Sequence, residues 1–154
     1  MNRLTLLPAA ALAVAALAAA TAAGAVRTET LRIYEQQTSI RVTRADGTVL
    51  TREPLPAPRP GDRLDVTYRG FRGTHAAHAR RATSTTHLVC LFGRGEPDCT
   101  SHVAIGGSML VFTGNPGTVV LGTGRYRGAT GRVVRSADAG GNDLDIVARI
   151  RLRG

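Results

Sequence analysis

The sequence predicts an all-β domain, built as a sandwich or a barrel, on three observations. Apolar and polar residues alternate in many short segments, which is the pattern of strands with one buried face. Turn-forming glycine, proline, asparagine and aspartate residues separate these segments at nearly regular spacing. After residue 25, no segment keeps a helical period for three turns. Many short strands of this kind are typical of sandwiches and barrels.

The N-terminal segment, residues 1–25, has the pattern of a secretory signal peptide. Arg3 supplies a positive charge, residues 4–20 are almost wholly apolar, and small residues precede a cleavage site after Ala25. We therefore predict a signal peptide over 1–25 and one secreted, extracytoplasmic domain over 26–154. The alternative is an uncleaved anchor, because the apolar run is nearly long enough to span a bilayer. No later stretch is apolar enough, so we expect no stable membrane span after cleavage.

The clearest strand is the last one, over residues 144–152. Five apolar residues fall on one face and charged residues on the other, which predicts a strand with one buried side. The apolar face consists of Leu144, Ile146, Ala148, Ile150 and Leu152. The same alternation predicts strands at 31–35 and 64–68. Further strands are predicted at 40–44, 87–92, 102–105, 108–113, 118–121 and 132–135.

Two segments are predicted to lie outside the central strands. Residues 54–60 are rich in proline, which cannot donate to a sheet ladder, so we expect a crossing loop or an edge. Residues 73–86 are small and polar without a clear period, and we expect a mobile loop there.

The chain is strongly basic, with a net charge of +9, and all of its basic residues are arginine. The arginines are spread along the chain, and no helix-turn-helix, zinc-finger or RRM pattern accompanies them, so we expect no nucleic acid partner. A solvated basic surface is the favoured interpretation. Attraction to an acidic envelope or polymer stays open.

Cys90 and Cys99 are the only cysteines, and they flank a turn-rich segment of an exported chain. A disulfide is therefore predicted rather than a redox or metal pair. Closing so short a loop stabilises a fold by about 3 kcal/mol in the chain-entropy model.

Three other patterns resemble a metal site, a hydrolase active site and a phosphate-binding loop, but each lacks a required feature. His75 and His78 have a metal-binding spacing only on a helix, with no ligand cluster nearby, so we expect no metal site there. His87, His102 and Ser108 lack the Gly-x-Ser-x-Gly elbow of a hydrolase. The glycine-rich segment 122–131 precedes a strand instead of opening a helix, so it is interpreted as a hairpin and not as a phosphate-binding loop.

That segment, Gly-Thr-Gly-Arg-Tyr-Arg-Gly-Ala-Thr-Gly, resembles the signature hairpin of the allene oxide cyclase and dirigent barrel superfamily, through Gly122, Gly124, Tyr126, Gly128 and Gly131. The strand at 31–35 is similar to the opening strand of that family, and Gly61-Asp62 stands where the family places its second motif. The resemblance implies an eight-stranded antiparallel barrel with an apolar cavity for a small molecule, assembled as a homotrimer. Such barrels steer cyclisation or coupling without metal or cofactor.

The resemblance and the strand parity together mark Glu35 as the candidate catalytic residue. If Leu31 and Ile33 face the interior, so does Glu35, and it matches the acidic position of the family. A carboxyl group among apolar walls has a raised pKa and serves as an acid or a base. The alternative places Glu35 at the rim, paired with an arginine. Tyr68 is predicted to line the cavity, and Gln37 is a candidate to hold a water or a substrate oxygen.

Two functions follow from these expectations. The first is a cofactor-free cyclase, an isomerase acting on a small apolar molecule in the cavity. The second is a non-catalytic secreted barrel that binds such a molecule or has a structural role. Fold similarity favours the first without establishing it.

Overall fold

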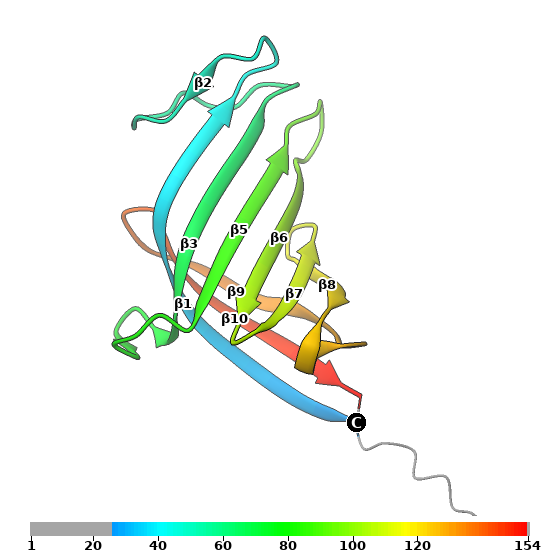
Figure 1. Ribbon diagram of the computed structural model, residues 1–154. Helices are drawn as coiled ribbons and strands as arrows, with labels where there is room; N and C mark the ends of the chain where they lie inside the picture. The colour runs from blue at the N-terminus through cyan, green and yellow to red at the C-terminus, as the bar shows by residue number, and fades with distance from the viewer. Residues whose placement is uncertain (1–25, 154) are drawn as a thin grey trace, which may run out of the picture.

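The computed structural model describes residues 26–153, and the predicted signal peptide lies outside the described residues. It is all-β, with no α-helix in the described part of the chain (Figure 1). Its ten strands and one short 3₁₀ helix follow one another in this order: β1 (Arg27–Thr43), β2 (Val49–Leu50), β3 (Arg63–Thr74), β4 (Ala77–His78), β5 (Ser84–Leu91), β6 (Asp98–Ile105), β7 (Ser108–Thr113), β8 (Thr118–Gly122), η1 (Gly124–Tyr126), β9 (Thr130–Gly140) and β10 (Asp143–Leu152).

Eight of these strands close into an antiparallel barrel, which confirms the predicted fold class. Around the barrel the order is β1-β10-β9-β8-β7-β6-β5-β3, and β3 pairs with β1 again. The two-residue strands β2 and β4 only extend β1 and β3 at their ends. The start of β1 and the end of β10 lie side by side, with Arg27 opposite Leu152 (Figure 1).

Strand β1 closes the barrel because it is long enough to pair with two neighbours. Residues 27–35 pair with β10, and residues 33–43 pair with β3. The two ladders overlap at residues 33–35, so Glu35 lies where the backbone is held from both sides. A register shift between Gln37 and Ser39 interrupts the alternation just beyond this point.

The alternation of the last strand predicts its burial correctly. Ala148 and Ile150 are 3% and 0% exposed, while Arg149 between them is exposed. They belong to one apolar cluster with residues of β6, β7, β8, η1 and the segment between η1 and β9, namely Val103, Leu110, Phe112, Val119, Tyr126 and Ala129. The core therefore occupies the barrel interior near the end where β1 begins.

The predicted mobile loop over 73–86 is partly wrong. β3 continues to Thr74, β4 pairs back onto it, and β5 already begins at Ser84. The pattern failed there because Ser, Thr, Ala and His give weak hydrophobic contrast between the two faces of a strand. The loop over 54–60 is confirmed, since no strand includes these residues.

The glycine-rich segment 122–131 connects β8 to β9 as predicted, although it is not a tight hairpin. It contains the 3₁₀ turn η1, which buries the Tyr126 ring completely. A Cβ on Gly122 would meet the carbonyl oxygen of Tyr126, and one on Gly131 would meet that of Arg149. The glycines thus allow three backbone segments to approach closely.

Candidate functional site

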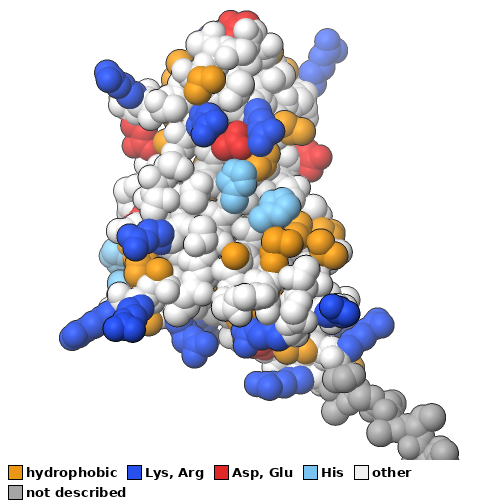
Figure 2. All heavy atoms as spheres, in the orientation of Figure 1, with side chains coloured by type: hydrophobic (Ala, Val, Ile, Leu, Met, Phe, Trp, Pro, Cys, Tyr) orange, Lys and Arg blue, Asp and Glu red, His pale blue; other side chains and the backbone are white. Residues whose placement is uncertain are grey.

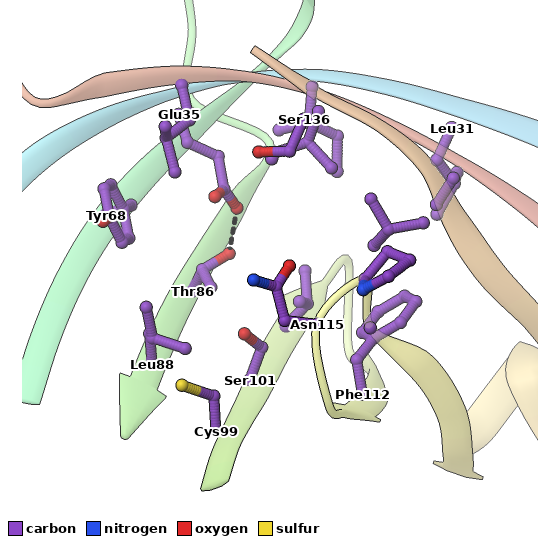
Figure 3. A pocket seen from close by; sticks show the side chains of 18 of the residues that line it. Leu31, Glu35, Tyr68, Thr86, Leu88, Cys99, Ser101, Phe112, Asn115 and Ser136 are labelled. Carbon is purple, nitrogen blue, oxygen red and sulfur yellow. Dashed lines mark hydrogen bonds between the residues drawn. The ribbon is translucent and has the colours of Figure 1, made fainter. Parts of the chain in front are cut away.

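The barrel interior contains a cavity of about 280 Å³, whose lining side chains are drawn in Figure 3. This volume is just below the range of about 300–1,000 Å³ that is usual for small-molecule sites. Most of its wall is apolar and comes from inward-facing residues of six strands: Leu31, Ile33, Leu88, Val103, Phe112, Val133, Leu144, Ile146 and Ala148. The predicted cavity residues Leu31, Ile33 and Tyr68 all lie on this wall.

The β7–β8 connection, residues 114–117, forms one side of the cavity. The Asn115 side chain points into the cavity, across from Glu35 and Thr86 (Figure 3). Cys99 also lies on the wall, and it forms the predicted disulfide with Cys90 on the paired strand. The disulfide is therefore confirmed, and it ties β5 to β6 beside the cavity.

Glu35 projects into the cavity from β1, as its parity with Leu31 and Ile33 predicts. It is only 6% exposed, and its Oε1 accepts a hydrogen bond from the Thr86 hydroxyl on β5 (Figure 3). Removal from water raises the pKa of Glu35, and the Thr86 hydrogen bond partly opposes this because it favours the charged form. The group is thus held in one orientation, with its pKa above that of an ordinary glutamate.

The alternative in which Glu35 sits at the rim beside an arginine is wrong. The ion pairs of residues 26–153 involve Glu29, Asp62 and Asp65, and Glu35 is in none of them. Without a guanidinium to stabilise its negative charge, only the Thr86 hydrogen bond opposes the effect of burial, and the pKa of Glu35 stays raised.

Tyr68 lies on the same wall and is 6% exposed. Burial, followed by the negative charges of Glu35 and Asp143, raises the pKa of Tyr68 to about 12. Its phenol is therefore a hydrogen-bond donor at neutral pH. A donor and an acid–base group thus share one end of the cavity.

The expectation for Gln37 is wrong, since this residue does not line the cavity. Its side-chain amide donates to Glu53 over 3.1 Å, and its backbone N–H donates to Asp143 over 2.9 Å. Both partners, Glu53 and Asp143, lie outside the lining of the cavity. Neither contact is visible in local alternation.

Sequence reasoning missed most of the polar wall. Thr86, Ser101, Asn115 and Ser136 line the cavity. Their neighbours in sequence are also small or polar, so the alternation that reveals an apolar wall gives no signal for them. Only Ser101 could have been predicted, because it alternates with Cys99 and Val103 on the inward face of its strand.

One further hydroxyl is buried close to Glu35. Ser84 lies opposite Gly70, which in turn lies opposite Glu35. Its Oγ is the one buried side-chain polar atom without a hydrogen-bond partner among the described residues. Glu35, Thr86 and Ser84 thus form a small cluster of buried polar side chains within the mostly apolar interior of the barrel.

The histidines and Ser108 lie elsewhere. His75 and His78 pack their rings against Tyr34. The Nε2 atom of His87 lies 3.4 Å from Oδ1 of Asp65. The Ser108 hydroxyl accepts the backbone N–H of Arg125, so it is part of the η1 turn. Within residues 26–153 no three His, Cys, Asp or Glu side chains come close enough to hold a metal ion.

The described residues contain no helix long and apolar enough to cross a bilayer. Comparison of the chain with protein-family models, curated proteins and solved structures found no match.

Proposed function

We propose that this protein is an exported barrel that binds a small apolar molecule and uses Glu35 to transfer a proton in a cofactor-free isomerisation or cyclisation. The observation that carries the proposal is a buried carboxyl group on the wall of an apolar cavity, with no ion pair. The resemblance to allene oxide cyclases and dirigent proteins supplies the reaction class. The disulfide and the N-terminal pattern support export.

The residues have separate roles in this proposal. Glu35 gives a proton to a ligand oxygen when neutral, or takes one from a carbon when ionised. Thr86 holds its carboxyl group in place, and Tyr68 donates a hydrogen bond to the ligand. The apolar wall excludes water, which keeps the pKa of Glu35 raised.

Binding is tested with the neutral fluorescent probe N-phenyl-1-naphthylamine. We expect Ala148→Phe to abolish the fluorescence rise, because Ala148 lines the cavity and the new ring fills it. Ala76→Phe makes the same chemical change at an exposed position outside the cavity and should leave the fluorescence rise intact. Equal signals from the two variants would place the probe outside the barrel.

Proton transfer is tested with 5-nitrobenzisoxazole, whose ring opens to a coloured cyanophenolate when a base removes its carbon-bound proton. Wild-type protein should accelerate this opening, and Glu35→Gln should reduce the rate to that of buffer. The rate should rise with pH through the raised pKa of Glu35, because only the ionised carboxylate is a base. Identical rates for wild type and Glu35→Gln would contradict the acid–base role.

The second candidate is a barrel that binds without catalysis. It is favoured by the neutral hydroxyl and amide groups of Ser101, Asn115 and Ser136, which suit hydrogen bonds to a ligand more than proton transfer. In that case the probe binds to wild type and Glu35→Gln alike, and neither opens the benzisoxazole. The homotrimer implied by the resemblance is also a proposal, which light scattering of the purified protein tests.

A further inference from the structure

The outer wall formed by β1, β10 and β9 carries five exposed arginines on three adjacent strands. They are Arg32 from β1, Arg149 and Arg151 from β10, and Arg132 and Arg135 from β9. Four of them stand next to inward-facing residues, so strand parity directs their side chains outward. Arg135 follows the register shift at Val134 and pairs with the outward position Val147. We refer to these five residues as the arginine wall.

The register brings these arginines close together. Arg149 lies directly opposite Arg132, and Arg32 and Arg135 both lie opposite Val147 in the next row. With strands about 4.8 Å apart and a rise of about 3.3 Å per residue, the five positions fit within an area of about 10 by 13 Å. Like charges directly opposite one another destabilise a sheet, so folding alone gives no reason for this arrangement.

No carboxylate neutralises the arginine wall. None of its five guanidiniums forms an ion pair within residues 26–153. Its other outward positions hold Thr28, Thr30, Thr130 and Val147. The nearest acid along β10 is Asp145, which accepts the backbone N–H of His75. Asp145 stands one outward row from Arg32 and Arg135 without pairing with either, so the wall keeps a net positive charge.

Exposed apolar side chains lie on β9 and on the neighbouring strand β8. Val134 is 41% exposed on β9 between Arg132 and Arg135, where the register with β10 shifts. On the neighbouring strand β8, Val120 and Leu121 are 57% and 52% exposed. Large aliphatic groups next to free guanidiniums make an amphiphilic surface.

We propose that this wall docks on an anionic lipid bilayer, with the guanidiniums on the lipid phosphates and the three aliphatic side chains in the interfacial region. Guanidinium groups bind phosphate oxygens in a bidentate manner. A soluble polyanion would satisfy the arginines but would gain nothing from Val120, Leu121 and Val134. The aliphatic groups therefore favour lipid as the partner, and this binding is independent of the cavity chemistry.

The test is co-sedimentation with vesicles of phosphatidylcholine, with and without 30% phosphatidylglycerol. Wild type should bind only the anionic vesicles, and binding should weaken steeply as salt is raised. Each basic residue near an anionic surface contributes about fivefold to partitioning, so Arg132→Gln/Arg135→Gln/Arg149→Gln should weaken binding about a hundredfold. The control Arg80→Gln/Arg81→Gln/Arg94→Gln removes the same charge from exposed loop positions and should change it by no more than a fewfold.

Val120→Ser/Leu121→Ser separates lipid from a soluble polyanion. It should weaken vesicle binding while leaving the binding of inorganic polyphosphate unchanged. Equal losses in the two arginine variants would overturn the proposal, because net charge and not the wall would then be responsible. So would polyphosphate binding without vesicle binding. Circular dichroism of each variant excludes loss of the fold as the cause.

Discussion

At the scale of single residues, the interior polar groups have unequal surroundings. Glu35 has one donor and no counter-charge, Thr86 supplies that donor, and Ser84 has no partner. Burying a polar group costs free energy unless a hydrogen bond compensates it. The three side chains therefore predict different effects of substitution on stability.

Glu35 predicts a stability that falls as pH rises. Its pKa is raised in the folded state, so above the pKa of an ordinary glutamate the native protein holds a proton that the unfolded chain has released. Stability is full below the unfolded pKa and is lost as pH increases toward the folded pKa. Glu35→Gln removes this dependence and should be the more stable protein at neutral pH. Urea unfolding from pH 4 to 8 measures the difference in unfolding free energy between the two proteins. The other acidic residues contribute equally to both and drop out of this difference. A constant difference would show that burial does not shift Glu35.

Ser84→Ala should stabilise the barrel or leave it unchanged, because the buried hydroxyl has no partner to lose. Thr86→Val keeps the shape of its side chain but removes the donor to Glu35, and it should cost about 1–3 kcal/mol. Thermal unfolding at one pH compares the two. A larger loss for Ser84→Ala than for Thr86→Val would indicate that Ser84 holds an ordered water or a partner.

At the scale of elements, the β8–η1–β9 connection needs glycine because two backbone segments pack directly against each other there. A side chain on Gly122 would collide with the backbone of Tyr126, whose ring is fully buried in the core. The backbone carbonyl cannot move without displacing η1. Gly122 is thus a position where the neighbouring backbone leaves no room for a side chain.

Gly122→Ala should therefore destabilise the protein by about 1–3 kcal/mol, the usual cost of overpacking. Gly93→Ala is the matched control, because its added methyl would meet nothing within 4 Å and its backbone is not left-handed. Denaturant unfolding measures the loss of stability, provided that the unfolding free energy depends on denaturant concentration with the same slope in both variants. Equal stability of the two would mean that η1 shifts without penalty.

At the scale of the whole molecule, the barrel is closed unevenly. β1 pairs along its length with β10 and β3, whereas β8 and β9 share a single paired position, Thr118 with Arg132. Fewer ladder hydrogen bonds lower the free energy of local opening. The β8–β9 seam is therefore the place where the barrel opens most easily.

Hydrogen exchange should reflect this difference. Amides of β8 should exchange faster than those of residues 33–35, where β1 is paired on both sides. Mass spectrometry of peptides after deuterium labelling measures the rates. If a cavity ligand enters through the seam, N-phenyl-1-naphthylamine should slow exchange in β8. Uniform protection around the barrel would argue against a weak seam.

Local patterns in the sequence determined the strand class, the buried face of β10, the inward direction of Glu35 and the disulfide. These depend on a period of two residues or on a single cysteine pair, and both are readable without knowing any partner strand. The tertiary structure decided what no local pattern contains. Thr86 reaches Glu35 across 51 residues, Asp143 accepts the backbone N–H of Gln37, and Arg149 comes to lie opposite Arg132. These contacts depend on the pairing and register of distant strands, which are settled by the closure of the barrel as a whole.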